Sequence, residues 1–385
     1  MDRPASRTWA LGARTPSGWV IGRVRGTPVI LAPSWLVIAA ILVFLYYPLV
    51  RGGVPGASVG TIALTTGAFV VMLFVSVLLH ELAHGLTASP LGARPREYVV
   101  TFWGGHTAFD RELPTPWTSA AVSAAGPAAN AALAALAWAL LQTGALSEPL
   151  RLVLWGALFS NALVAAFNLL PGLPLDGGRI LESLVWKVTG DRLRGTVAAA
   201  WGGRAIVVGG VLLALGVPFL QGRQPEIGRI VWVALLGSVL WAGAGQALQA
   251  VRFERSARDL DLRALAAPAV VLPASASLAD ADAVLAGRGP TGVVLAHDGR
   301  LVALLDPAVA AQVPPARRAS TELHSVSRRL APEQVVGVMA GPAALAAMAR
   351  AQGQGPVAVL LDHGAVAGVV EVARVADRLK DRGRR

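Results

Sequence analysis

Two histidines and a glutamate lie close together in one apolar stretch, in the order His80-Glu81-Leu-Ala-His84. Residues four apart lie on one face of an α-helix, so both imidazoles can reach the same metal ion. Glu81 lies beside them and is placed to deprotonate a water molecule that the metal holds. Zinc hydrolases use this arrangement, in which the metal lowers the pKa of its bound water to about 7. The spacing therefore predicts metal-assisted hydrolysis with Glu81 as the general base.

The same short pattern also occurs by chance on the surfaces of soluble helices. Here the surrounding segment is apolar, and an ionisable group inside a membrane span costs about 2.5–3.5 kcal/mol on insertion scales. Three such groups so close together are difficult to explain without a function. The chain has no Cys, so any metal must bind His, Asp or Glu, and thiol nucleophiles and iron–sulfur clusters are excluded.

Two histidines leave the site one ligand short, because a catalytic zinc ion usually has three protein ligands and one water. The apolar part of the chain offers one other histidine, His106, which we interpret as a loop residue. It also offers Asp176, in a Pro- and Gly-rich segment that closes an apolar run. Two interpretations of Asp176 are open. It is a ligand turned inward where the helix breaks, or an ordinary turn aspartate before glycine.

The chain as a whole is strongly apolar: 54% of its 385 residues are hydrophobic and only 15% are charged. An average soluble protein has about 25% charged residues. This composition excludes a disordered protein, a coiled coil and most soluble enzymes, and it points to lipid. A bilayer takes about 20 apolar residues to cross. We predict six spans, at 29–50, 62–88, 119–142, 152–170, 205–220 and 230–251.

Basic residues are distributed unevenly between the flanks of these spans. One set of flanks includes most of the arginines, whereas the other has only Arg51, Arg151, Arg223 and Arg229. Because cytoplasmic loops carry excess Lys and Arg, we expect a multi-pass protein of the cell membrane with both termini in the cytoplasm, residues 1–28 included. The second and fourth spans then run in the same direction, so the histidines and Asp176 lie at the same end. The net charge of +11 needs no nucleic acid to explain it.

Residues 255–385 differ from the spans, with short apolar runs between charged or Gly-containing turns. The stretch that begins at Gly289-Pro290 and contains His297 matches the stretch that begins at Gly355-Pro356 and contains His363. Each copy reads as a strand, a tight turn, a second strand and a helix. We therefore predict a soluble cytoplasmic α/β domain that contains a pseudo-twofold pair.

Residues 18–250 resemble the site-2 protease family of intramembrane zinc metalloproteases. Three motifs match in order and within predicted spans: His80-Glu81-Leu-Ala-His84, then Gly126-Pro127-Ala-Ala-Asn130, then Asn168-Leu-Leu-Pro171 followed by Leu-Asp176-Gly177. The resemblance implies a site-2 protease core of six transmembrane helices with one Zn²⁺ per chain. It implies His80, His84 and Asp176 as the metal ligands and Glu81 as the general base.

The resemblance also implies that Asn130 and Asn168 hold the substrate backbone or the oxyanion near the metal. The alternative for both is a simple hydrogen bond between neighbouring helices. Between the second and third spans, the β-branched and aromatic residues from Tyr98 to Phe109 resemble the family's membrane-associated β-hairpin, which would align the substrate as an added strand.

The repeat resembles a cystathionine-β-synthase-type (CBS) domain pair. In such pairs a Thr, and an Asp three residues later, often hold the phosphate and ribose of a nucleotide. The corresponding residues here are Asp306 and Val309 in the first copy and Glu371 and Arg374 in the second. An acid in place of the Thr repels phosphate, so we expect a structural role or a homodimer through this degenerate pair.

The resulting prediction is a zinc endopeptidase that cuts a transmembrane helix of a single-span protein, such as an anti-sigma factor or another membrane-tethered regulator. The alternative from another class is a metal transporter or channel gated by the CBS pair. A non-proteolytic membrane scaffold is a third option, against which the intact metal motif argues. Glu81 separates the first two, because a hydrolase needs this base and a transporter does not.

Overall fold

The computed structural model of this chain describes residues 14–15, 18–144, 146–258, 260–288, 291–339, 341, 345, 348 and 355–384. Residues 289 and 290, which open the first repeat copy, and much of the predicted segment 1–28 lie outside the described residues. The chain forms two compact units, Met1–Leu248 and Gln249–Arg385, which we call the N-terminal and C-terminal units.

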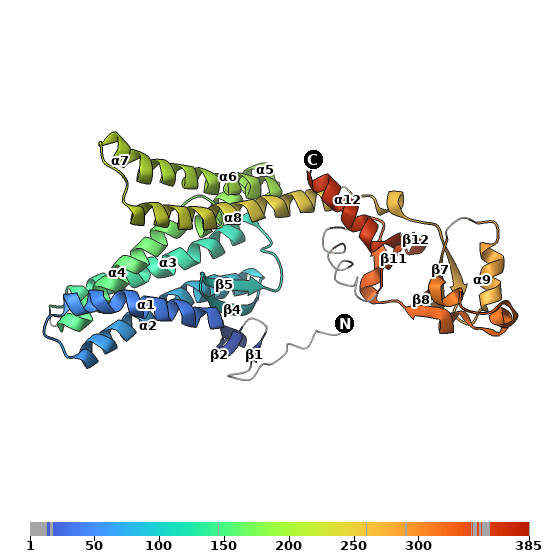
Figure 1. Cartoon of the computed structure of the whole chain (residues 1–385), viewed down its shortest axis with the longest axis horizontal. Helices are drawn as coiled ribbons and strands as arrows, with labels where there is room; N and C mark the ends of the chain where they lie inside the picture. The colour runs from blue at the N-terminus through green and yellow to red at the C-terminus, as the bar shows by residue number, and fades with distance from the viewer. Residues whose placement is uncertain are drawn as a thin grey trace. The chain divides into compact units, whose positions relative to one another are not determined.

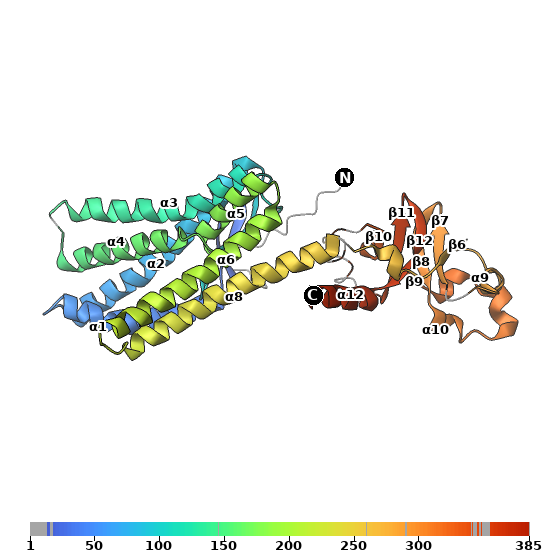
Figure 2. The same cartoon turned by 90° about the horizontal axis from the view of Figure 1, so that it is seen from above.

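In the described part of the chain, six helices are long and apolar enough to cross a membrane, which confirms the number of predicted spans. Helix α2 packs against α1, α3 and α4, and α6 packs against α8 through an alanine-rich contact (Figures 1 and 2). The helices are α1 (Pro33–Gly53), α2 (Val59–Ala88), α3 (Pro116–Leu141), α4 (Glu148–Asn168), α6 (Arg192–Val211) and α8 (Ile227–Arg258). The π-helical η2 (Leu212–Gly216) and α7 (Val217–Leu220) extend α6, and η1 (Ser89–Leu91) extends α2.

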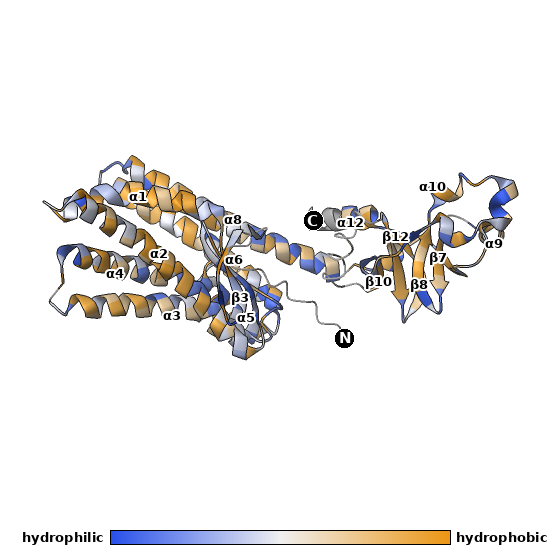
Figure 3. Cartoon of the chain, turned by 90° about the horizontal axis from the view of Figure 1, so that it is seen from below, coloured by the Kyte–Doolittle hydropathy of each residue, from blue (hydrophilic) through white to orange (hydrophobic). Residues whose placement is uncertain are grey.

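These helices are rich in apolar residues, as the orange ribbons of the N-terminal unit show in Figure 3, and many of these residues are exposed. Phe44 on α1 is 80% exposed and Leu64 on α2 is 78% exposed. A large apolar surface of this kind needs a covering of lipid or protein. The outward-facing side chains therefore fit a multi-pass membrane protein.

Several helix ends differ from the predicted span boundaries, and two of these differences have a clear physical cause. The first span was expected from residue 29, but residues 29–31 belong to a strand and the helix begins at Pro33, a residue favoured in the first turn. A short apolar run does not distinguish a strand from a helix. The fifth span was expected from residue 205 but begins at Arg192, where the Asp191 side chain accepts a hydrogen bond from Leu193 N at 2.8 Å. Arginines in its first turns lower the hydropathy there and hid this start.

A five-stranded sheet packs against the end of α2 that carries the two histidines. Its order is β1-β2-β3-β4-β5, with β3 and β4 parallel and the other pairs antiparallel. Tyr98 packs directly on Gly85 of α2, where a larger residue would collide with its ring. The strands are β1 (Arg14–Thr15), β2 (Gly18–Val24), β3 (Thr27–Leu31), β4 (Pro95–Thr101) and β5 (Gly104–Phe109). The hairpin expected between the second and third spans is therefore present as β4 and β5, and β5 is an edge strand.

The C-terminal unit contains two similar strand-turn-strand copies, as predicted. In both copies the turn has two residues with positive φ, Asp298 (48°) with Gly299 (73°) and His363 (47°) with Gly364 (86°), which is typical of a tight hairpin. The first sheet has the order β6-β7-β8-β9 and the second β10-β11-β12.

The first copy and its surroundings comprise η3 (Leu262–Leu265), β6 (Ala269–Pro273), α9 (Leu278–Leu285), β7 (Gly292–His297), β8 (Arg300–Leu305), α10 (Pro307–Ala310), η4 (Pro315–Ser320), η5 (Leu323–Val326) and β9 (Ser327–Arg329). The second comprises η6 (Pro332–Gln334), β10 (Val335–Gly337), β11 (Val357–Asp362), β12 (Ala365–Glu371) and α12 (Val372–Arg384). Buried Val294, Val359 and Val369 pack the two copies together.

Candidate metal centre and active site

Three predicted ligands meet at one point in the N-terminal unit. The Nε2 atoms of His80 and His84 are 3.1 Å apart, and Asp176 Oδ2 lies 3.1 Å from the first and 3.5 Å from the second. Among the described residues, this is the one group of three or more such side chains that could hold a metal ion. A tetrahedral zinc site with bonds of 2.0–2.2 Å separates its ligand atoms by about 3.3 Å. The observed separations match that spacing.

The other ring nitrogens reveal the protonation of the imidazoles. His84 Nδ1 lies 2.7 Å from the carbonyl oxygen of Val122, which can only accept, so Nδ1 carries the proton. His80 Nδ1 lies 2.5 Å from Asn130 Oδ1, whose amide nitrogen donates elsewhere, so this Nδ1 is also a donor. In neutral rings both Nε2 atoms are then unprotonated. Two lone pairs and a carboxylate oxygen therefore face one another, which is the donor set that a cation stabilises.

Two further observations fit a metal ion at this point. Asp176 Oδ2 is buried and has no hydrogen-bond partner within the described residues. Gly126 on α3 lies against both rings, so that a Cβ there would be 2.6 Å from His80 Nε2 and nearer still to His84 Nε2. The first glycine of the second motif is thus required by close approach to the ligands.

Asp176 reaches the histidines because the chain breaks after α4 and restarts. The segment Leu169–Leu175 separates α4 from α5 (Asp176–Thr189), and Asp176 is the first residue of the new helix. Gly177 and Gly178 pack against backbone atoms of that segment, where any Cβ would overlap them. The helix break was predicted, whereas α5 itself was not.

Glu81 is buried, with 6% of its surface exposed, and it lies against β5. Thr107 Oγ1 is 2.8 Å from Glu81 Oε2 and 3.0 Å from the Glu81 carbonyl oxygen. Gly105 also faces Glu81, and a Cβ at that position would collide with its side chain. The motif predicts Glu81 beside the metal. The contact with Thr107 could not be predicted from it, because the two residues are 26 positions apart in the sequence.

The Asn130 side chain hydrogen-bonds two buried residues. Besides its contact with His80, it donates from Nδ2 to Asn161 Oδ1 at 2.8 Å, and Asn161 donates to Ser76 Oγ at 3.1 Å. This chain of amides fixes the orientation of the His80 ring. Asn161 and Ser76 were missed from sequence, since a lone Asn or Ser in a span carries no distinguishing pattern.

Asn168 has a different setting. Its side chain has no hydrogen-bond partner in the described part of the chain, and it lines both cavities that adjoin the metal site. One cavity, of about 290 Å³, extends along α2 and α4 toward Trp103. The other, of about 370 Å³, extends toward Arg111, Glu112 and Arg192. His106 also lines it; this residue was expected in a loop but is an exposed residue of strand β5. The Asn168 side chain can therefore hydrogen-bond a bound peptide, whereas the Asn130 side chain already has two partners.

An ion-pair bridge crosses the wall of the larger cavity. Arg192 on α6 contacts Glu112, on the loop after β5, at 2.6 Å and Glu182 on α5 at 3.0 Å. Glu182 is buried, with 4% of its side chain exposed, whereas Glu112 is 83% exposed. The bridge joins the hairpin to the helix that begins with Asp176.

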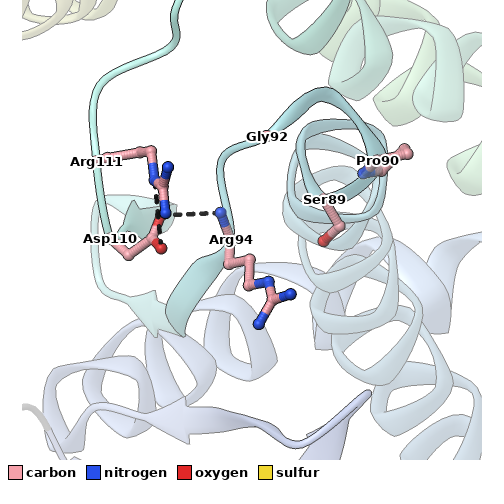
Figure 4. A pocket seen from close by; sticks show the side chains of 6 residues that line it. All are labelled: Ser89, Pro90, Gly92, Arg94, Asp110 and Arg111. Atoms are coloured by element: carbon pink, nitrogen blue, oxygen red, sulfur yellow. Dashed lines mark hydrogen bonds and ion pairs between the residues drawn. The ribbon is translucent and has the colours of Figure 1, made fainter. Parts of the chain in front are cut away.

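A separate pocket of about 400 Å³ lies where α2 ends and β5 leads into the next loop (Figure 4). Asp110 accepts a hydrogen bond from Arg94 N at 2.9 Å and lies 3.7 Å from Arg111 Nε. The guanidinium of Arg94 points away from that of Arg111 (Figure 4). The pocket contains none of the predicted site residues.

In the C-terminal unit, Asp306 caps α10 by accepting from Ala308 N at 3.0 Å, and it pairs with Arg328 at 2.6 Å. Val309 lies within α10, Glu371 is the exposed last residue of β12, and Arg374 is exposed in the first turn of α12. Asp306 therefore stabilises the start of α10 and the position of Arg328.

Comparisons with known proteins address the whole chain. Residues 68–147 and 143–212 match peptidase family M50. Rip3 of Mycobacterium tuberculosis is 30% identical over 374 residues, which cover 93% of this chain and 92% of Rip3. The protein sll0528 of Synechocystis is 28% identical over 368 residues, which cover 92% of this chain and 93% of that one. Both relatives are named as zinc metalloproteases.

Two solved structures are similar to separate parts of the chain. The site-2 protease from Methanocaldococcus jannaschii aligns at 21% identity with a TM-score of 0.41, covering 60% of this chain and 94% of that one. The CBS domain of a bacterial CNNM/CorC family Mg²⁺ transporter aligns at 15% identity with a TM-score of 0.27, covering 38% of this chain and 94% of that one. Identity with Rip3 extends over nearly the full length of both chains, and the matched M50 segments include every residue of the metal cluster. The protein therefore belongs to the site-2 protease family of intramembrane zinc metalloproteases, peptidase family M50.

Proposed function

We propose that this zinc metalloprotease cleaves a peptide bond within or near the transmembrane helix of a single-span, membrane-tethered regulator, such as an anti-sigma factor. The observation that carries the proposal is the position of the centre. His80, Glu81 and His84 belong to a membrane helix rather than to a loop. A substrate must therefore bring its peptide bond to the membrane helices, as a single-span protein can.

His80, His84 and Asp176 would hold the zinc ion. When bound there, zinc supplies a Lewis acid that lowers the pKa of a coordinated water to about 7 and polarises a carbonyl. Glu81 accepts the proton of the attacking water and then donates it to the leaving amine, so one carboxylate serves as base and acid in turn. Asn130 keeps His80 oriented, and Asn168 is free to hydrogen-bond the substrate backbone.

The edge strand β5 supports a binding mode for an unwound substrate. A peptide bond can be hydrolysed only after its helix opens, and the released amides then need partners in a site with little water. An edge strand offers unpaired backbone groups, to which an extended peptide can add as a further strand. Glu81 lies against β5, so a peptide on that edge comes close to the general base.

The charge distribution supports cleavage near the cytoplasmic side. Arg94, Arg111 and Arg192 lie at the end of the helices that carries the metal site. Arg51 lies in the last turn of α1 and Arg223 follows α7, at the opposite ends. An excess of arginine is typical of cytoplasmic flanks. The arrangement favours termini in the cytoplasm and release of the regulator's soluble part into it.

The test co-expresses a tagged single-span substrate with wild-type protein or with Glu81→Gln. We expect cleavage by the wild type and a loss of about 10²–10⁴-fold in the variant, the usual contribution of a general base. Equal cleavage by both would refute the mechanism. Zinc content measured in detergent serves as the control, because Glu81→Gln keeps all three ligands.

Family membership favours the hydrolase over the transporter. The two remain separable by experiment in proteoliposomes that contain Glu81→Gln. Metal flux that persists in this variant without proteolysis would favour a transporter. For the substrate class, membrane-protein fragments compared between wild-type and Glu81→Gln strains should differ in single-span proteins. A difference confined to soluble proteins would contradict the proposal.

A further inference from the structure

Thr107 is the one hydrogen-bonding side chain that contacts the Glu81 carboxylate in the described part of the chain. Its Oγ1 lies 2.8 Å from Oε2, whereas Oε1 has no hydrogen-bond partner among those residues. The single proton of the Thr107 hydroxyl faces Oε2 and also the Glu81 carbonyl oxygen at 3.0 Å. The carboxylate oxygen is nearer and is the stronger acceptor, so Thr107 occupies one oxygen of the carboxylate. Oε1 is left for the reaction, and Glu81 lines both cavities that adjoin the metal site.

The strand geometry explains why this contact is well defined. Gly105 and Thr107 are two residues apart on β5, so both face the same side of the strand. Glu81 lies against that side. Gly105 leaves the space that the carboxylate fills, and Thr107 supplies the donor. The next strand, β4, holds Thr107 in register opposite Tyr98, which itself packs on Gly85 of α2.

Packing against Gly105 confines the Glu81 side chain, but few polar contacts fix the rotation of its carboxylate. No Arg or Lys lies within salt-bridge distance of its carboxylate in the described residues. A glutamate side chain has three rotatable bonds, and a general base must hold its oxygen within hydrogen-bond reach of the proton that it removes. A donor fixed on a strand limits the rotation of the carboxylate.

We propose that Thr107 is a positioning residue for the general base: by holding Oε2 of Glu81, the edge strand β5 orients Oε1 toward the reacting water. The same strand is the one on which the substrate would pair. Alignment of the substrate and orientation of the base therefore depend on one element. The proposal rests on the role assigned to Glu81 under the proposed function.

The first experiment reads the carboxylate directly. Infrared spectra of purified full-length protein in detergent, each minus the Glu81→Gln spectrum, isolate the Glu81 carboxylate stretch. We expect this band to shift in Thr107→Val and to return to its wild-type position in Thr107→Ser, which restores the hydroxyl. The measurement needs no substrate and is repeated after the metal is removed with a chelator.

The matched control is Thr101→Val on β4. The Thr101 hydroxyl donates to Gly104 O at 3.0 Å within the same hairpin, but it does not contact Glu81. This variant should leave the carboxylate band in place. A band that does not move in Thr107→Val, or one that moves equally in Thr101→Val, would overturn the proposal.

The second experiment separates positioning from substrate binding. With zinc content matched, Thr107→Val should lower kcat by about 10- to 100-fold, the range expected for a small misplacement of a reacting group. KM should stay within about twofold, and Thr107→Ser should recover most of kcat. An unchanged kcat in Thr107→Val would refute the proposal. If the wild type cleaves no single-span substrate, the proposed function fails, while the infrared result still decides the role of Thr107.

Discussion

Aspartates in the two units have opposite surroundings. In the C-terminal unit, Asp282 contacts Arg318 at 2.5 Å and Asp306 contacts Arg328 at 2.6 Å. In the N-terminal unit, Asp176 faces only the nitrogens of imidazoles in its ion-pair contacts within the described residues. An aspartate that pairs with an arginine near the surface is satisfied, and such a pair contributes about 0–1 kcal/mol to stability. Asp176 has a buried Oδ2 that faces unprotonated nitrogens and lacks a cation. This difference in partners, rather than in exposure, sets the functional carboxylate apart from the structural ones.

The comparison is tested most strongly by removing one aspartate from each unit. Asp176→Ala should lose stoichiometric zinc, because two histidines alone form an incomplete site. Asp306→Ala should keep one zinc per chain. Metal analysis of both variants in detergent checks the pair. Stoichiometric zinc in Asp176→Ala would show that the ligand assignment is wrong.

Gly126→Ala should have the next largest effect. The new methyl group must displace the His80 and His84 rings, so we expect zinc affinity to fall by at least about 10-fold, as it does when ligand orientation is disturbed. Helical content by circular dichroism should not change. Gly67→Ala, on α2 where a Cβ meets nothing within 4 Å, is the matched control. Equal zinc affinity in the two variants would contradict the packing argument.

Asn130→Leu tests the hydrogen bond that supports the metal ligand His80. It removes the acceptor for His80 Nδ1, and the loss of such a contact usually lowers metal affinity by about 10–100-fold. Asn161→Leu acts one step further away and should have a smaller effect of the same sign. Competition with a chelator of known affinity measures both. A larger loss of metal affinity in Asn161→Leu than in Asn130→Leu would contradict the argument that Asn130 is the residue that orients His80.

The substitution Asp306→Ala should have the smallest effect, a loss of stability that depends on pH. The hydrogen bond from Arg328 holds the pKa of Asp306 below the ordinary value. The resulting stabilisation is complete above the unfolded-state pKa of about 3.9 and is lost as the pH falls through the lower folded-state value. Replacing this N-cap with alanine should cost about 1 kcal/mol at neutral pH. Chemical denaturation of the full chain at pH 7 and pH 3 measures the free energy of unfolding of the wild type and of Asp306→Ala. The difference between the two proteins should be smaller at pH 3.

Much of the fold follows from local patterns. The six spans, the hairpin from Tyr98 to Phe109 and the repeated turns around His297 and His363 were all predicted. Each depends on hydropathy, on β-branched residues or on turn chemistry within a short window. The errors at residues 29 and 205 arose where that window was ambiguous. In one case a strand resembled a helix start, and in the other arginines obscured a helix.

The site was predicted where the chemistry is carried by residue type and spacing. His80, Glu81, His84 and Asp176 combine rare types with an apolar setting, which made them recognisable in advance. Thr107 was not recognised, because an isolated hydroxyl has many ordinary uses. Its contact with Glu81 exists only once β5 has packed on α2. Such contacts depend on tertiary packing, which no single window of sequence contains.

The bridge made by Arg192 has a mechanical consequence. Its guanidinium is bound on one side to the loop after β5 and on the other to buried Glu182 of α5. A pull on the hairpin therefore passes through one side chain to the helix whose first residue is Asp176. The position of Asp176 is thus linked to the hairpin by a contact that includes none of the reacting atoms.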